Sequence, residues 1–169
     1  MNADERGSEM AARADRAKAT ALATRAYHAA CREDWAAANR AMAEAGKSTP
    51  NVIALILTRF CDTIISLGRD MAVTSPDDGN GDGPVRPLWL NADTGQATMD
   101  ADDETLPAAA RWMGQLLAAR GAQDFDGFQA LLKAMPDDGR ERGAYANALL
   151  TSCVTMTTLA ARSRPGGAA

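Results

Sequence analysis

Histidine is almost absent from this sequence, in which His28 is the only one among 169 residues. A metal site with two histidine ligands is therefore excluded within one chain. Aromatic residues are also few, at 5%, so the core must be built mainly from Leu, Ile, Val, Met and Ala. Lysine is scarce as well: fifteen of the eighteen basic residues are arginine, a bias that is typical of GC-rich bacterial or phage genomes.

Paired cysteines are missing too. The three cysteines, Cys31, Cys61 and Cys153, each lie singly within a helical pattern. A zinc site made of these three and His28 can be drawn, but the sequence has no Cys-x-x-Cys knuckle of the kind that structural zinc sites use. Free cysteine is commonly buried as a small apolar residue. We therefore expect packed, reduced thiols in a cytoplasmic protein, with no metal and no cofactor.

Long apolar runs are lacking. The longest, Val52–Leu57, is far short of the ~20 residues that a membrane span requires, and the charged N-terminus shows no signal peptide. We therefore expect no membrane contact. A basic stripe that could bind phosphates is also lacking, and residues 77–104 hold eight acids against one base, Arg86. This charge distribution argues against a nucleic-acid partner.

The acidic segment contains a partial calcium motif. Asp78, Asn80, Asp82 and Gly83 match the first half of an EF-hand loop, but Trp89 stands at the twelfth position, where that loop needs a bidentate Glu. A solvated linker explains the same residues, and weak cation binding at Asp78–Asp82 is the alternative.

Hydrophobic periodicity predicts an all-α helical bundle of two similar three-helix units. The expected helices are 4–30, 34–45 and 50–72 in the first unit, and 103–120, 123–135 and 140–162 in the second. We expect one domain over residues 1–169, with units at 4–72 and 103–162. Between them, residues 74–102 are predicted to form an acidic loop and a small β-hairpin insert, and residues 163–169 a disordered tail.

The two units read as copies of one helical unit. Asp34-Trp35 opens the short helix of the first unit, and Asp124-Phe125 opens that of the second, ninety positions later. These openings locally resemble the helical hairpins of tetratricopeptide-like arrays, but a period of about 90 residues rather than 34 does not match that family. The pseudo-repeat predicts two helical layers related by a pseudo-twofold axis.

Two helices carry distinctive faces. Helix 50–72 is apolar around most of its circumference and should be central in the core. Its narrow polar stripe consists of Arg59, Asp62, Ser66 and Arg69. The last helix carries hydroxyls at Thr151, Ser152, Thr155, Thr157 and Thr158, which favour either a tight helix contact within the chain or a face for self-association.

The leading functional hypothesis is a non-enzymatic protein that acts through protein–protein contacts, as an adaptor, regulator or assembly subunit, with a protein partner or a homo-oligomer. The possible interaction face comprises Arg13, Arg16, Thr151, Thr155, Thr158 and Trp89. Catalytic residues are not apparent. One alternative is a nucleic-acid-binding regulator that uses the arginines of the first helix. The other is an enzyme or ligand-binding protein with a pocket between the units, lined by Trp35, Trp112 and Tyr145.

Overall fold

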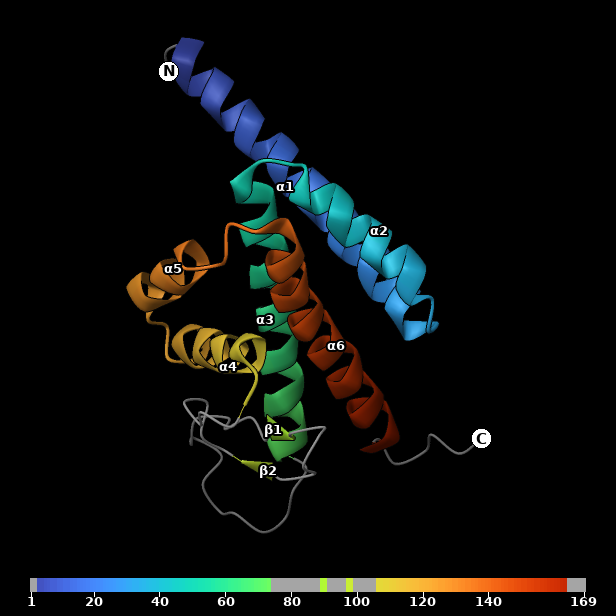
Figure 1. Cartoon of the computed structure of the whole chain (residues 1–169). Coiled ribbons are helices and arrows are strands. Elements are labelled where there is room, and N and C mark those ends of the chain that lie inside the picture. The colour runs from blue at the N-terminus through green and yellow to red at the C-terminus, as the bar shows by residue number, and fades with distance from the viewer. Residues whose placement is uncertain (1–2, 74–88, 91–96, 99–105, 164–169) are drawn as a thin grey trace. The chain divides into compact units, whose positions relative to one another are not determined.

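The computed structural model describes residues 3–73, 89–90, 97–98 and 106–163, with side chains over 5–69 and 106–162. Its helices are α1 (Ala3–Cys31), α2 (Trp35–Gly46), α3 (Pro50–Val73), α4 (Ala108–Gly121), α5 (Phe125–Lys133) and α6 (Gly139–Ser163) (Figure 1). The predicted all-α fold class is confirmed over this part of the chain.

One predicted helix begins later than expected. The helix predicted over 103–120 begins at Ala108, because Pro107 stands at its N-cap position with an extended ψ of 144°. Proline also disfavours helical backbone in the residue before it, which keeps Leu106 out of the helix. Leu106 is nevertheless buried, so the approach to α4 still packs against the fold.

Two short strands precede α4. Strand β1 (Trp89–Leu90) pairs antiparallel with β2 (Ala97–Thr98), with Trp89 opposite Thr98. The rest of the predicted 74–102 insert, including the Asp78–Asp82 loop, lies outside the described residues, as do residues 164–169 of the tail.

The chain forms two compact units, Met1–Phe60 and Cys61–Ala169. Their boundary falls inside α3, whereas the boundary predicted from the sequence follows residue 72. Each unit therefore contains one half of α3 together with its own helical hairpin, and each is described by itself.

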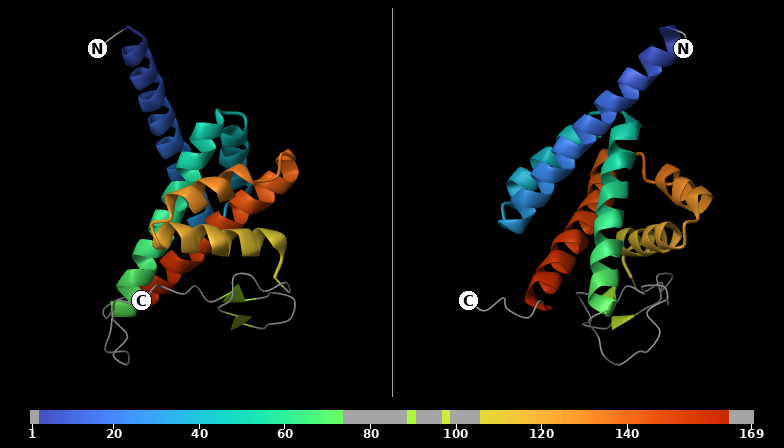
Figure 2. Two further views of the ribbon diagram at one scale, coloured as in Figure 1. Left: turned by 90° about the vertical axis from the view of Figure 1, so that its left-hand side faces the viewer. Right: turned by 180° about the vertical axis from the view of Figure 1, so that it is seen from behind.

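The first unit is built on alanine. The second half of α1 lies along α2 (Figures 1 and 2). Both helices bury mostly small residues. The buried residues are Ala19, Leu22, Ala23, Ala26, Ala29 and Ala30 of α1 and Ala38, Ala41, Met42 and Ala45 of α2. Small side chains let the two backbones approach closely, so many weak dispersion contacts replace the few large ones that aromatic residues would make.

Polar contacts tie α1 to the start of α3. The Asp15 carboxylate accepts hydrogen bonds from Thr49 Oγ1 at 3.1 Å and from Asn51 Nδ2 at 3.0 Å. Arg59 donates to Thr20 Oγ1 at 2.6 Å. These contacts hold α3 against the middle of α1 and leave the N-terminal half of α1 beyond α2 (Figure 1).

The second unit has a core of larger side chains. The indole of Trp112 donates to the Leu131 carbonyl at 2.9 Å, and its ring lies 5.2 Å from that of Tyr145, centroid to centroid. Trp112 therefore joins α4 to both α5 and α6. Leu149 and Leu150 are fully buried on α6, which runs beside the second half of α3 (Figures 1 and 2).

The α1–α2 and α4–α5 hairpins turn in the same way. Glu33 and Gln123, the second residues after α1 and α4, take positive φ values of 61° and 58°. The next residue is an aspartate in both turns, Asp34 or Asp124, and its side chain accepts a hydrogen bond from the backbone N–H three positions on. An Asp N-cap satisfies one of the helix's free N–H groups.

The positive φ values predict that glycine stabilises both turns. A non-glycine residue in the left-handed region is strained, and glycine removes that strain while it adds freedom to the unfolded chain. We expect Glu33→Gly and Gln123→Gly each to raise the free energy of unfolding by roughly 0.5 kcal/mol in urea titrations. Arg40→Gly, inside α2, is the control and should lower it by about 1 kcal/mol. Equal losses in all three variants would contradict the interpretation.

Candidate functional site

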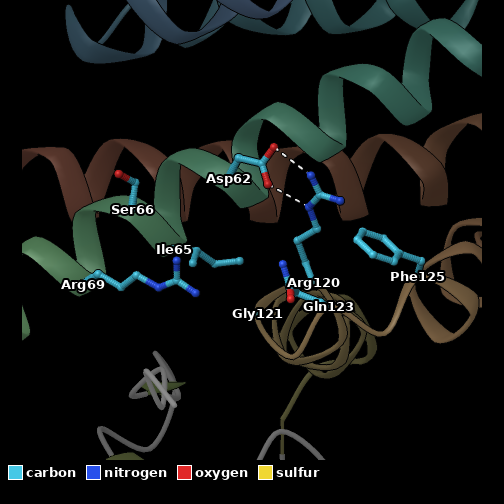
Figure 3. Close-up of a pocket in the computed structure, with 8 residues that line it drawn as sticks. All are labelled: Asp62, Ile65, Ser66, Arg69, Arg120, Gly121, Gln123 and Phe125. Atoms are coloured by element: carbon cyan, nitrogen blue, oxygen red, sulfur yellow. Dashed lines mark hydrogen bonds and ion pairs between the residues drawn. The ribbon is translucent and has the colours of Figure 1, made fainter. Parts of the chain in front are cut away.

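A surface depression of about 370 Å³ lies in the second unit, between the second half of α3 and the α4–α5 turn (Figure 3). Its lining residues are Asp62, Ile65, Ser66 and Arg69 from α3 and Arg120, Gly121, Gln123 and Phe125 from the turn region. The volume is at the lower end of the range typical of small-molecule sites.

An ion pair forms one wall of the depression. Arg120 donates from Nε and Nη2 to the two carboxylate oxygens of Asp62, at 2.7 and 3.1 Å (Figure 3). The Arg120 guanidinium also lies over the rings of Phe125 and Phe128, at 5.8 and 5.5 Å from their centroids. The hydrogen bond to Asp62 is the main cause that raises the pKa of Arg120 above its ordinary value.

The other lining side chains take no part in this ion pair. Arg69 is exposed and makes no ion pair with any other residue that the structure describes. Phe125, the first residue of α5, is 58% exposed, an unusual position for a large aromatic ring. Gln123 is held at the rim by its left-handed backbone. Within the part of the chain that the structure describes, the depression therefore combines a cation without an ion-pair partner, an amide and an exposed apolar ring.

The sequence had indicated three of these residues for another reason. Asp62, Ser66 and Arg69 belong to the predicted polar stripe of helix 50–72, which here faces the depression. Arg120, Gln123 and Phe125 were missed. The similarity of Asp124-Phe125 to Asp34-Trp35 was the available signal, because Trp35 also begins a helix after an Asp cap and is 38% exposed.

The aromatic residues proposed for a pocket do not line this one. Trp112 is buried and Tyr145 packs on it inside the second unit, while Trp35 belongs to the first unit. Their simpler interpretation, as core or turn aromatics, fits their positions.

The predicted interaction residues are divided between two helices. Arg13 and Arg16 are exposed on α1, and Thr151, Thr155 and Thr158 are exposed on one face of α6. The side chain of Trp89, in β1, lies outside the described residues. The structure therefore leaves the five described members open to solvent.

The hydroxyl series of α6 is used in two ways. Thr157 and Thr158 donate back to the carbonyls of Cys153 and Val154, at 2.9 and 3.0 Å, as expected for threonine in a helix. Ser152 turns inward and donates to Met113 Sδ at 3.2 Å. The series thus serves both the α4–α6 contact and an exposed face.

The thiols are packed in two of the three cases. Cys61 and Cys153 are buried, but Cys31 is exposed, so the prediction of packing is wrong for Cys31. Cys31 is the last residue of α1. Within the described ranges, no group of three His, Cys, Asp or Glu residues could hold a metal ion.

Helix α3 meets the size requirement for a membrane span. Pro50–Arg69 is 20 residues long with a mean hydropathy of 1.5, so α3 is a candidate span although its uninterrupted apolar run is short. Length and composition alone are weak evidence, because a core helix of a soluble protein passes the same test. Val52, Ile56, Leu57, Phe60 and Cys61 are buried in this fold.

Different reactivities of the thiols follow from their burial. Desolvation, followed by the nearby charge of Asp62, raises the pKa of the Cys61 thiol to about 12. We expect a thiol reagent at about pH 8 to label Cys31 in the native protein, and Cys61 and Cys153 only after unfolding. Peptide mapping by mass spectrometry measures the sites. Fast labelling of Cys61 in folded protein would contradict the buried position.

The Asp62–Arg120 pair should stabilise the fold modestly. Asp62 is 51% exposed and Arg120 25%, so we expect a coupling of about 1 kcal/mol from a double-mutant cycle with Asp62→Asn and Arg120→Gln in urea. The control pair is Arg25–Glu44, whose side chains are 56% and 52% exposed, and its coupling should be smaller. Equal couplings would show that the bidentate geometry adds nothing.

Comparison with known proteins adds no assignment to this geometry. The chain matches no protein-family model, no curated protein and no solved structure. The function must therefore be argued from the side chains themselves.

Proposed function

We propose that the protein acts through protein–protein contacts and that α1 provides the docking surface. The main support for this proposal is that residues 5–18, about half of the 29-residue α1, include no buried residue. Met10 is 68% exposed there. Within this segment, Asp15 contacts Thr49 and Asn51 at the start of α3. A helix with few tertiary contacts is marginal in water, so this segment gains stability when a partner covers it.

A line of mostly small side chains, with one methionine among them, runs along the exposed side of α1. This α1 stripe consists of Gly7, Met10, Ala14, Ala17, Ala21 and Thr24, all of them exposed. The alternating spacing of three and four residues is the heptad spacing through which one helix packs along another. The stripe faces away from the residues that α1 buries against α2, so it remains available in the folded first unit.

The charges beside the α1 stripe favour one kind of partner. By helical spacing, Arg6 and Arg13 flank it on one side and Lys18 on the other. Arg25 lies on the same side as Lys18, but its guanidinium is paired with Glu44 of α2. A second copy of α1, in either direction, would bring like charges together at these flanking positions, which destabilises a helix pair. The partner that fits is therefore a helix with small or aliphatic residues on its contact face and acids beside them.

Two further expectations belong to the same proposal. We infer that the chain repeats one three-helix unit, which is supported by the matching turns at Glu33-Asp34 and Gln123-Asp124. We also propose that a small β-hairpin insert lies between the units and that the whole chain forms one domain. The proposed setting is a bacterial cytoplasm. The exposed threonine face of α6 offers a second surface, through which homo-oligomers would form.

A peptide probe tests the α1 stripe directly. The probe is a synthetic heptad helix with Ala and Leu at its contact positions and Glu beside them. We expect the full chain to bind it with an affinity that falls as salt rises, because the flanking charges are exposed. Ala14→Glu with Ala21→Glu should weaken binding at least tenfold, measured by fluorescence anisotropy, since both substitutions put a charge into the stripe.

The matched control is Ala36→Glu with Ala43→Glu, the same change at the same spacing on the exposed side of α2. This control should bind as the unchanged chain does. Equal loss in both double variants would contradict the assignment of the stripe. Binding of duplex DNA in a gel shift, with no binding of the peptide, would instead favour the nucleic-acid alternative.

A further inference from the structure

The depression beside the α4–α5 turn has the charge of an anion site. Asp62 is the only acid among the described residues that line it, and both of its carboxylate oxygens accept from Arg120. Arg69 then contributes a positive charge with no acid matched to it in this part of the chain. The described lining residues together carry one excess positive charge, so an anion that enters does not need to displace the Asp62–Arg120 pair.

The same depression has an apolar side. Phe125 exposes 58% of its surface at the end where Arg120 crosses its ring. Ile65 adds a methyl-bearing side chain from α3 between Arg69 and the turn (Figure 3). A flat apolar group placed against these side chains removes their surface from water, which favours binding.

We propose that this depression binds an organic carboxylate that carries a flat apolar group. Arg69 pairs with the carboxylate, the Gln123 amide donates to it from the rim, and Phe125 contacts the apolar group. A volume of about 370 Å³ suits a single ring with a short acidic arm, or the last residue of a peptide with its free carboxylate. Both sources share this chemistry, and the site is separate from the α1 stripe.

Titration of the full, isotope-labelled chain with phenylacetate tests the assignment by NMR. We expect saturable shifts of backbone amides in the α4–α5 turn, with a dissociation constant on the order of millimolar, as suits so small a ligand. Phenylacetamide, which lacks the charge, and acetate, which lacks the ring, should each bind at least tenfold more weakly. Equal binding of phenylacetate and phenylacetamide overturns the proposal.

Substitutions of Arg69 and Phe125 test the contacts with the carboxylate and with the ring. Arg69→Gln and Phe125→Ala should each raise the dissociation constant for phenylacetate at least fivefold, whereas Arg69→Lys, which keeps the charge, should raise it less. The control is Arg140→Gln, at an exposed position in the first turn of α6, and it should leave the constant unchanged. Unchanged binding in Arg69→Gln overturns the proposal, and amide spectra of each variant establish that it is folded.

A second ligand distinguishes the two sources. N-acetyl-alanyl-phenylalanine presents the same ring and carboxylate at the end of a peptide. Binding at least fivefold tighter than that of phenylacetate supports a polypeptide terminus as the natural ligand, and weaker binding supports a small free carboxylate. If neither compound gives saturable shifts, the proposal of a carboxylate site is wrong. The proposal for α1 is tested separately by the peptide probe.

Discussion

The guanidinium of Arg120 is the group on which the depression in the second unit depends. It donates twice to Asp62 on α3 while it covers the rings of Phe125 and Phe128 on α5, so one side chain of α4 contacts two other helices. An arginine can do this because its planar fork satisfies a carboxylate edge-on while its faces remain free to stack. A lysine at this position would supply only the charge.

The depression is a consequence of this contact. Arg120 and Arg69 both line it, and two unpaired guanidinium groups in so small a space would repel each other. Asp62 neutralises one of them, and Arg69 has no ion-pair partner among the described residues. The described lining is therefore neutral where Arg120 lies and positive where Arg69 lies, an arrangement that suits the carboxylate we propose.

The alanine-rich composition of the first unit limits how much apolar surface its helices can bury. Because its helical hairpin is lined by alanines, each contact buries little apolar surface and the helices must lie close together to gain enough of them. Helix α2 has only twelve residues, less than half the length of α1, so it can cover only part of α1. The remaining part of α1 is held in line by the Asp15 contacts and by continuation of the helix, and its small-residue side stays uncovered.

Local patterns in the sequence were sufficient for the helices and their caps. Thr49 accepts a hydrogen bond from the Val52 N–H at the start of α3, and the aspartates before Trp35 and Phe125 act as N-caps as their residue type predicts. The late start of α4 at Ala108 follows from Pro107, a local effect that periodicity alone did not weigh. The burial of Cys61 and Cys153 but not Cys31 shows the limit of residue type, since a cysteine at the end of a helix can fall on either side.

The sequence by itself determined the all-α class, the helix positions and the polar stripe of α3 that contains Asp62 and Arg69. These follow from backbone propensity and from the 3.6-residue period, which act within one helix. Only the tertiary structure decided that Arg120 meets Asp62 across 58 positions of chain and that Phe125 stays exposed beside them. Periodicity shows which side of a helix is polar, but the partner of that side is set by how other helices pack against it.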